Sequence, residues 1–276
     1  MYLPAPIQPR LTTFVPIGDA MLRTETVGHG DPLFMLHGLG CSFWSTHYLA
    51  DALADIRRVV NVENRGIGAS TGTVDGLSIA TMADDAAAVI RKLANGPVDV
   101  LGYSMGGYIS QHLAIRHPDV VRSLVLLSTS PGGAVATPVP DSTKEAWAAA
   151  DAMAGPEGEW YSRSISFREG WCDAHPEEFA AINARRALYA EPADVWSAQF
   201  AATEVHLMTG IDMKEITCPV LVIHGTGDRV VPYPNGEALS HGLADVTFVT
   251  LPGAGHLSWL EDLDAVVGPI REFYGA

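Results

Sequence analysis

The residues best suited to chemistry are a serine, an aspartate and a histidine, each within a segment that contains glycine. Ser104 lies in GYSMGG, Asp228 in HGTGDRVVP and His256 in GAGHL. A serine hydroxyl is a weak nucleophile until a general base accepts its proton, and a histidine base needs an acid that holds its tautomer. The three segments therefore predict a nucleophile, an orienting acid and a general base for acyl transfer.

Ser104 stands between two different kinds of sequence. The apolar run 98–101 predicts a buried strand before it, and the pattern over 105–117 predicts a helix after it. A nucleophile on such a sharp turn needs small neighbours, which Gly102 and Gly106 supply. The start of the helix also places the positive end of its dipole beside the serine.

The candidate acid and base follow strand-like runs as well. Apolar residues at 219–224 precede Asp228, and a similar run at 246–251 precedes His256. Glycines around the histidine allow a loop that reaches across to the serine. The chain order Ser104, Asp228, His256 is the order expected when these three residues act on an α/β sheet.

A fourth segment, HGLG at 37–40, follows the apolar run 33–36. Backbone amides in such a turn can point at a developing oxyanion, and the N–H groups of Leu39 and Met105 are the expected donors. We interpret His37 as a structural residue that anchors this turn.

The elements needed to position these residues alternate between strands and helices. A hairpin is predicted from 12–17 and 21–27, further strands at 33–36, 59–62, 98–101, 124–127, 219–224 and 246–251, and helices at 44–55, 79–94, 105–117, 234–243 and 261–274. Continuous apolar strands between helices favour a doubly wound, mostly parallel sheet covered on both faces. We assign 1–130 and 206–276 to this α/β core.

Residues 131–205 interrupt the alternation. They contain no apolar strand run and hold four of the six tryptophans, so we predict a mostly helical insertion that lies over the sheet. Large aromatic side chains in this insertion and beside the catalytic segments are candidates for an apolar substrate pocket. They are Trp44, Tyr103, Trp147, Trp160, Trp171, Trp196 and Trp259.

Composition excludes several classes of protein. The chain has 276 residues, is 47% hydrophobic and carries a formal charge of −15. Such an acidic surface repels phosphate backbones and anionic lipids, so we expect neither nucleic acid nor membrane as a partner. The longest apolar runs are far shorter than the roughly 20 residues of a membrane-spanning helix. The start of the chain does not resemble a secretory signal.

Three cysteines, Cys41, Cys172 and Cys218, lie far apart, which fits a reducing compartment and a cytoplasmic protein. We interpret Cys41 as a packed side chain. The sequence has neither a CxxC pair nor HExxH, and no GxGxxG opens a helix. We therefore expect no metal and no organic cofactor.

Taken together, the HGLG turn, the segment NRGIGAS at 64–70, the serine turn and the two late loops resemble the α/β-hydrolase superfamily. The resemblance covers the whole chain, with 131–205 in the place of the family's cap. It is similar in style to small esterases, enol-lactonases, cofactor-free perhydrolases and meta-cleavage C–C hydrolases. The family often has Asp where this chain has Glu63 or Asn64, so the geometry of that loop is in question.

The resemblance implies a serine hydrolase that cleaves a small to medium ester or lactone with an apolar part. Three alternatives remain open. One is a C–C hydrolase, in which Arg185 or Arg186 would hold a substrate carboxylate. The others are a biosynthetic enzyme for acyl transfer or cyclisation, and a ligand receptor on the same fold. The expected partner is a small molecule, and the oligomeric state stays open, a homodimer included.

Overall fold

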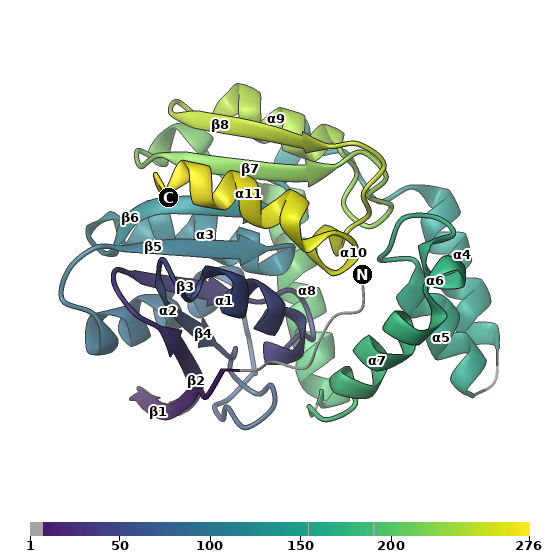
Figure 1. The fold of residues 1–276 in the computed structure, drawn as a ribbon, viewed down its shortest axis with the longest axis horizontal. Helices are drawn as coiled ribbons and strands as arrows, with labels where there is room; N and C mark the ends of the chain where they lie inside the picture. Colours follow the sequence, from purple (N-terminus) through teal and green to yellow (C-terminus); the bar gives the residue numbers. More distant parts are fainter. Residues whose placement is uncertain (1–7, 154, 190) are drawn as a thin grey trace.

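A twisted sheet of eight strands runs through the part of the chain that the structure describes (Figure 1). The computed structural model describes residues 8–153, 155–189 and 191–276. The strands are β1 (Leu11–Ile17), β2 (Ala20–Gly28), β3 (Pro32–Leu36), β4 (Arg58–Val62), β5 (Val98–Tyr103), β6 (Val121–Leu127), β7 (Val220–Gly225) and β8 (Val246–Leu251). The segment 1–7, in which no secretory signal was expected, lies outside the described residues.

The strand order is β1-β2-β4-β3-β5-β6-β7-β8. Strands β1 and β2 are antiparallel to their neighbours, and β3 to β8 are parallel. Strands β5 and β7 are buried along their whole length, as strands covered by helices on both faces must be. The predicted mostly parallel, doubly wound sheet is confirmed.

The helices cover both faces of this sheet. In the core they are α1 (His47–Leu53), α2 (Ile79–Leu93), α3 (Met105–Arg116), α9 (Pro234–Gly242), α10 (Ser258–Glu261) and α11 (Leu263–Phe273), with single turns η1 (Phe43–Ser45), η2 (Pro118–Val120) and η4 (Met213–Glu215). One apolar layer joins the sheet to α2, α3 and α9, and the other joins it to α1, α10 and α11. None of the helices in the described ranges has the length and apolarity needed to cross a membrane.

The topology brings the segments that were predicted to be catalytic to one edge of the sheet. Strand β5 pairs with β3 and β6, and β6 leads through β7 to β8, all in parallel. The carboxyl ends of parallel strands meet at the same edge of a sheet. The segments that follow β3, β5, β7 and β8 therefore converge there, although they are far apart in sequence.

The insertion forms a helical body at that edge, to the right in Figure 1. It comprises η3 (Gly133–Val135), α4 (Asp141–Ala152), α5 (Pro156–Ser164), α6 (Trp171–Ala174), α7 (Pro176–Arg186) and α8 (Ala193–Thr209). Four of its buried side chains, Phe167, Trp171, Phe179 and Ile182, join the apolar layer beneath α1 and α11. The boundary predicted at residue 205 falls inside α8, because this helix continues onto α2 and α3 of the core.

Candidate active site

Ser104 lies on the turn between β5 and α3, in the middle of the sheet. Its backbone has φ 53° and ψ −124°, a conformation that residues other than glycine rarely adopt. Ser104 N–H donates to Leu127 C=O at 3.0 Å, and Thr129 Oγ1 donates to Ser104 C=O at 2.8 Å. Ser104 is partly exposed whereas Tyr103 and Met105 are buried. The turn therefore leaves the serine accessible while both its neighbours are enclosed.

The two glycines beside Ser104 are required by close approach of other backbone segments. A Cβ on Gly102 would collide with the Gly106 carbonyl, and a Cβ on Gly106 would collide with the Leu36 carbonyl at the end of β3. Any larger side chain would push α3 away from the sheet. The glycines thus do what the sequence predicted, which is to make room for the turn.

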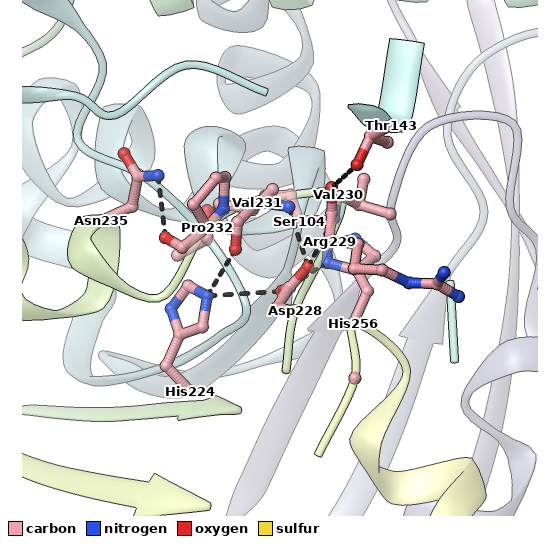
Figure 2. A network of polar contacts seen from close by, with 12 residues as sticks. Ser104, Thr143, His224, Asp228, Arg229, Val230, Val231, Pro232, Asn235 and His256 are labelled. Atoms are coloured by element: carbon pink, nitrogen blue, oxygen red, sulfur yellow. Dashed lines mark hydrogen bonds and ion pairs between the residues drawn. The ribbon is translucent and has the colours of Figure 1, made fainter. Parts of the chain in front are cut away.

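Asp228 and His256 form a buried hydrogen-bonded pair at the same edge of the sheet (Figure 2). Nδ1 of His256 lies 2.8 Å from Oδ2 of Asp228. The other carboxylate oxygen, Oδ1, accepts from the N–H groups of Val230 and Val231 at 2.9 and 2.8 Å. With Nδ1 bound to the acid, the Nε2 atom of His256 is left to exchange a proton with a nucleophile.

A second histidine, which the sequence analysis did not single out, also contacts the acid. His224 is fully buried, and its Nε2 lies 2.8 Å from Val231 C=O and 3.3 Å from Asp228 Oδ2. Both of these partners are acceptors, so Nε2 must carry the proton. Figure 2 shows the two histidine rings on opposite sides of the Asp228 carboxylate.

This environment keeps Asp228 charged. Burial by itself would raise the pKa of its carboxyl, but the charge of His256 and the hydrogen bonds from His224 and His256 outweigh burial and hold the pKa well below its ordinary value. In the described residues no hydrogen bond joins Ser104 to His256. Such catalytic contacts commonly shorten only when substrate is bound.

The two expected oxyanion donors lie at the ends of β3 and β5. Leu39 belongs to a turn that is closed by a hydrogen bond from Cys41 N–H to Gly38 C=O, 3.1 Å long. Met105 is the first residue of α3. Neither Leu39 N–H nor Met105 N–H donates to another described residue, so both are available to a ligand.

His37 is buried beneath this turn, as predicted for an anchoring residue. Burial lowers its pKa to about 3, so its ring is neutral. Its Nδ1 lies 3.4 Å from Ser45 Oγ, and its C=O accepts from Asn64 Nδ2 at 3.5 Å. These contacts connect the oxyanion turn to the interior of the core.

Comparison with known proteins identifies the family of the chain. Residues 31–263 match the family model described as the alpha/beta hydrolase fold. The chain is 32% identical over 267 residues to a pimeloyl-(acyl-carrier protein) methyl ester esterase from Chromobacterium violaceum, a match that covers 91% of this chain and 97% of that protein. The chain belongs to the α/β-hydrolase family.

Two further proteins show how broad this α/β-hydrolase family is. A 2-hydroxymuconate semialdehyde hydrolase from a Pseudomonas species is 27% identical over 255 residues, which cover 89% of this chain and 87% of that protein. The structure of an alpha/beta hydrolase fold protein from Chitinophaga pinensis superposes with a TM-score of 0.82 at 22% identity, over 97% of this chain and 98% of that one.

The segment 64–70, in which this α/β hydrolase departs from the family pattern, is held in place by Glu63. The buried carboxylate accepts hydrogen bonds from Ser42 Oγ and, at 3.0 Å, from Ala69 N–H, and it pairs with Arg23 at 3.2 Å. Burial raises the pKa of Glu63 in spite of these hydrogen bonds. The side chain of Glu63, which is longer than that of Asp, thus organises the segment 64–70 from inside through these contacts.

The expected pocket aromatics of this α/β hydrolase divide into two groups according to burial. Trp44, Tyr103, Trp171 and Trp259 are buried, and their contacts are those of packed core residues. Tyr103 Oη donates to Ser45 Oγ and Trp259 Nε1 donates to Ser45 C=O, both at 2.7 Å. Packing therefore accounts for the burial of these four side chains, and a role in substrate binding stays a prediction for them as well.

The other three aromatics are accessible. Trp147 is half-buried, and Trp160 and Trp196 are 38% and 39% exposed. Trp196 stacks on Phe200 with ring centroids 5.2 Å apart. A role in substrate binding stays a prediction for these residues.

The cap arginines are engaged with protein groups. Arg186 Nη2 lies 3.0 Å from a carboxylate oxygen of Glu191, and its guanidinium lies over the Trp44 ring. Arg185 lies over the ring of Tyr48, 4.8 Å from its centroid. Because Glu191 neutralises Arg186, a substrate carboxylate would have to compete with that ion pair.

Within the described ranges, no group of three or more metal-ligating side chains is placed to hold an ion.

Proposed function

We propose that the protein is a serine hydrolase that cleaves a small to medium ester or lactone with an apolar part. The observation that carries the proposal is the pairing of a strained, accessible Ser104 with a buried Asp228–His256 hydrogen bond at one edge of the sheet. Strain of this kind is retained where the surrounding structure compels it, and it is concentrated at functional sites.

In the proposed reaction, Ser104 Oγ attacks the carbonyl carbon while His256 Nε2 accepts its proton. The carbonyl oxygen becomes an oxyanion, which the N–H groups of Leu39 and Met105 stabilise. The imidazolium then protonates the leaving alcohol as the tetrahedral intermediate collapses to an acyl-enzyme. Water attacks the acyl group with His256 again as base, and this step releases the acid and restores Ser104.

Asp228 serves this cycle by remaining ionised. Its two backbone donors fix the carboxylate, so that Oδ2 stays on the Nδ1–H of His256. A charged acid in this position favours the tautomer with a free Nε2 lone pair, and it stabilises the imidazolium that forms in each half-reaction.

The apolar character of the substrate is inferred from the cap. Trp160, Trp196 and Phe200 leave a third or more of their surface exposed, and Trp196 lies against Gly40 of the oxyanion turn. Aromatic walls beside a few polar groups are typical of small-molecule sites. The methyl ester esterase among the relatives supports an ester as the bond that is cleaved.

Covalent labelling tests the proposal. We expect a fluorophosphonate probe to add its mass to the peptide that contains Ser104, and we expect Ser104→Ala to abolish the adduct. Labelling at Cys41 instead would reject Ser104 as the nucleophile. Labelling of Ser104 without turnover of any p-nitrophenyl ester, lactone or meta-cleavage product would favour a ligand receptor.

The same substrate panel separates the remaining alternatives. Turnover of a meta-cleavage product in preference to esters would favour the C–C hydrolase. The similarity to the 2-hydroxymuconate semialdehyde hydrolase from Pseudomonas supports keeping this alternative. A product that retains an added alcohol in place of water would favour acyl transfer.

A further inference from the structure

Helix α8 of the cap has an unusual distribution of side chains. Two of the four residues that it buries, Gln199 and His206, are polar, whereas Trp196, Phe200 and Met208 are exposed. Gln199 has no exposed surface at all. A buried amide is destabilising unless its hydrogen-bonding groups find partners, so the presence of glutamine at this position needs a reason other than packing.

One partner of Gln199 lies in the oxyanion turn. Its Oε1 accepts a hydrogen bond from Gly40 N–H at 2.9 Å, a contact between residues 159 positions apart. Because the Gly40 nitrogen is a donor, the amide must present its oxygen to it. Among the described residues nothing accepts from Gln199 Nε2, so the bond to Gly40 is the contact that orients this side chain.

The bonded amide is the central peptide of the turn. Cys41 N–H donates to Gly38 C=O, so Leu39 and Gly40 occupy the two middle positions. Gly40 has φ 64°, which is the left-handed value required at the third position of a type II turn. The peptide between Leu39 and Gly40 can flip in such turns, and a fixed partner for its N–H prevents that flip.

Other cap residues enclose Gly40 as well. A Cβ on Gly40 would collide with the carboxylate of Glu191 and with the indole of Trp196. The cap therefore packs directly onto the turn and contributes the acceptor that holds it.

We propose that Gln199 is a positioning residue, through which the docked cap holds the turn that carries Leu39. The inference rests on the proposed function, because it gives that turn the role of an oxyanion hole. In this inference, the oxyanion hole is complete only when the cap is docked on the core. The Gly40 amide therefore has its acceptor because α8 is docked on the core.

The test compares Gln199→Met with Ser197→Ala. Methionine keeps the length of the side chain and removes the acceptor. Ser197 is exposed on the same helix, where its hydroxyl donates to Ala193 C=O. For Gln199→Met on a short p-nitrophenyl ester we expect kcat to fall by about 10- to 100-fold, with KM within about twofold. Affinity for a trifluoromethyl ketone, which forms a tetrahedral adduct with the serine, should fall by the same factor.

Hydrogen exchange supplies a readout that does not depend on turnover. The Gly40 amide should be protected in the wild type and in Ser197→Ala, and it should exchange faster in Gln199→Met. If Gln199→Met does not fold, Gln199→Asn keeps the amide and shortens its reach, and the same losses are expected.

Two results would overturn the inference. Unchanged kcat and unchanged ketone affinity in a folded variant would show that the turn does not need Gln199. Equal losses of ester and ketone affinity at constant kcat would make Gln199 a pocket residue. Failure of the proposed function is distinct, because it would appear in the wild type as absent labelling and turnover.

Discussion

The core and the cap differ in how far they bury their side chains. In the core, strands such as β5 and β7 are buried from end to end, and backbone carbonyls approach so closely that glycine is required around Ser104. In the cap, α4 and α5 bury few residues, and Trp160, Trp196 and Leu188 remain exposed. Dense packing fixes positions, whereas a thinly packed, apolar surface can adapt. We infer that the core carries the reacting groups and that the exposed aromatic side chains of the cap determine which molecule reacts.

The largest expected effect tests the core. Ser104→Ala should reduce turnover by about six orders of magnitude, as loss of the nucleophile does in serine proteases. Substrate affinity should change little, because the hydroxyl contributes little to ground-state binding. Single-turnover kinetics measure the loss of turnover, and a binding titration measures the substrate affinity. Substantial hydrolysis by the variant would mean that the chemistry does not reside in this turn.

The next effect concerns the acid. Asp228→Asn should lower turnover by about three to four orders of magnitude, because an amide at this position favours the wrong tautomer of His256. The melting temperature serves as the control for folding. Near wild-type activity in Asp228→Asn would place the orienting acid elsewhere, the end of β6 being the first region to examine.

A third prediction concerns the contact between α8 of the cap and the core. His206 on α8 stacks on Tyr108 and lies 3.2 Å from His112, with Ser130 C=O on its other side. Burial, and then the charge of His112, lower the pKa of His206 from 6.5 to about 4. Between these values the unfolded chain binds a proton that the folded chain does not, so stability is lost as the pH falls from 6.5 to 4.

The expected loss from this one group is about 3 kcal/mol. Urea unfolding at pH 7 and pH 5 measures about 2 kcal/mol of this loss, because pH 5 lies only part of the way from 6.5 to 4. His206→Phe keeps an aromatic ring and cannot be protonated, so its free energy of unfolding should depend less on pH over this range. Parallel pH dependence in the two proteins would show that His206 does not titrate in this way.

A smaller effect is expected for His224, the second histidine that contacts Asp228. His224→Leu removes a donor from Asp228 and from Val231 C=O, and it should reduce kcat by about tenfold, the value of one buried hydrogen bond. Glutamine can place a donor near the position of Nε2, so His224→Gln should recover much of the rate. Equal losses in both variants would point to ring packing as the role of His224.

The smallest effects on rate are expected for the exposed aromatic residues of the cap. Trp160→Ala and Trp196→Ala should shift the preference between long and short esters by a few-fold and leave a small activated ester unaffected, since the charge-stabilising groups lie on core loops. Trp171→Ala is the contrasting variant. Its indole is buried against Phe167, so we expect a loss of stability of about 3–5 kcal/mol instead. An unaltered ester profile in both exposed variants would remove the cap from the specificity argument.

Local patterns account for most of what could be predicted from the sequence. The strands, the helices and the Ser104 turn follow from apolar runs and from glycines whose effects are felt within a few residues. The Asp228–His256 hydrogen bond could be anticipated because both residues follow strands of one parallel sheet. The contacts of Gln199 and His224 could not, because a lone buried polar residue has no periodic pattern and its partner is chosen by tertiary packing.

The cap shows the same limit. Its helices could be predicted as a group, but burial separates Trp171 from Trp196, and nothing in their neighbouring residues distinguishes the two. The continuation of α8 past residue 205 depends on its packing against the core, which the composition of the helix does not reveal.

The conformation of Ser104 has a consequence for how this protein can change over generations. A left-handed serine costs about 1–3 kcal/mol relative to an unstrained residue, and glycine would relieve that cost. Ser104→Gly should therefore make the protein more resistant to heat while it abolishes the nucleophile. Selection for thermal tolerance alone, in a laboratory population without demand for the proposed reaction, would therefore favour loss of this serine.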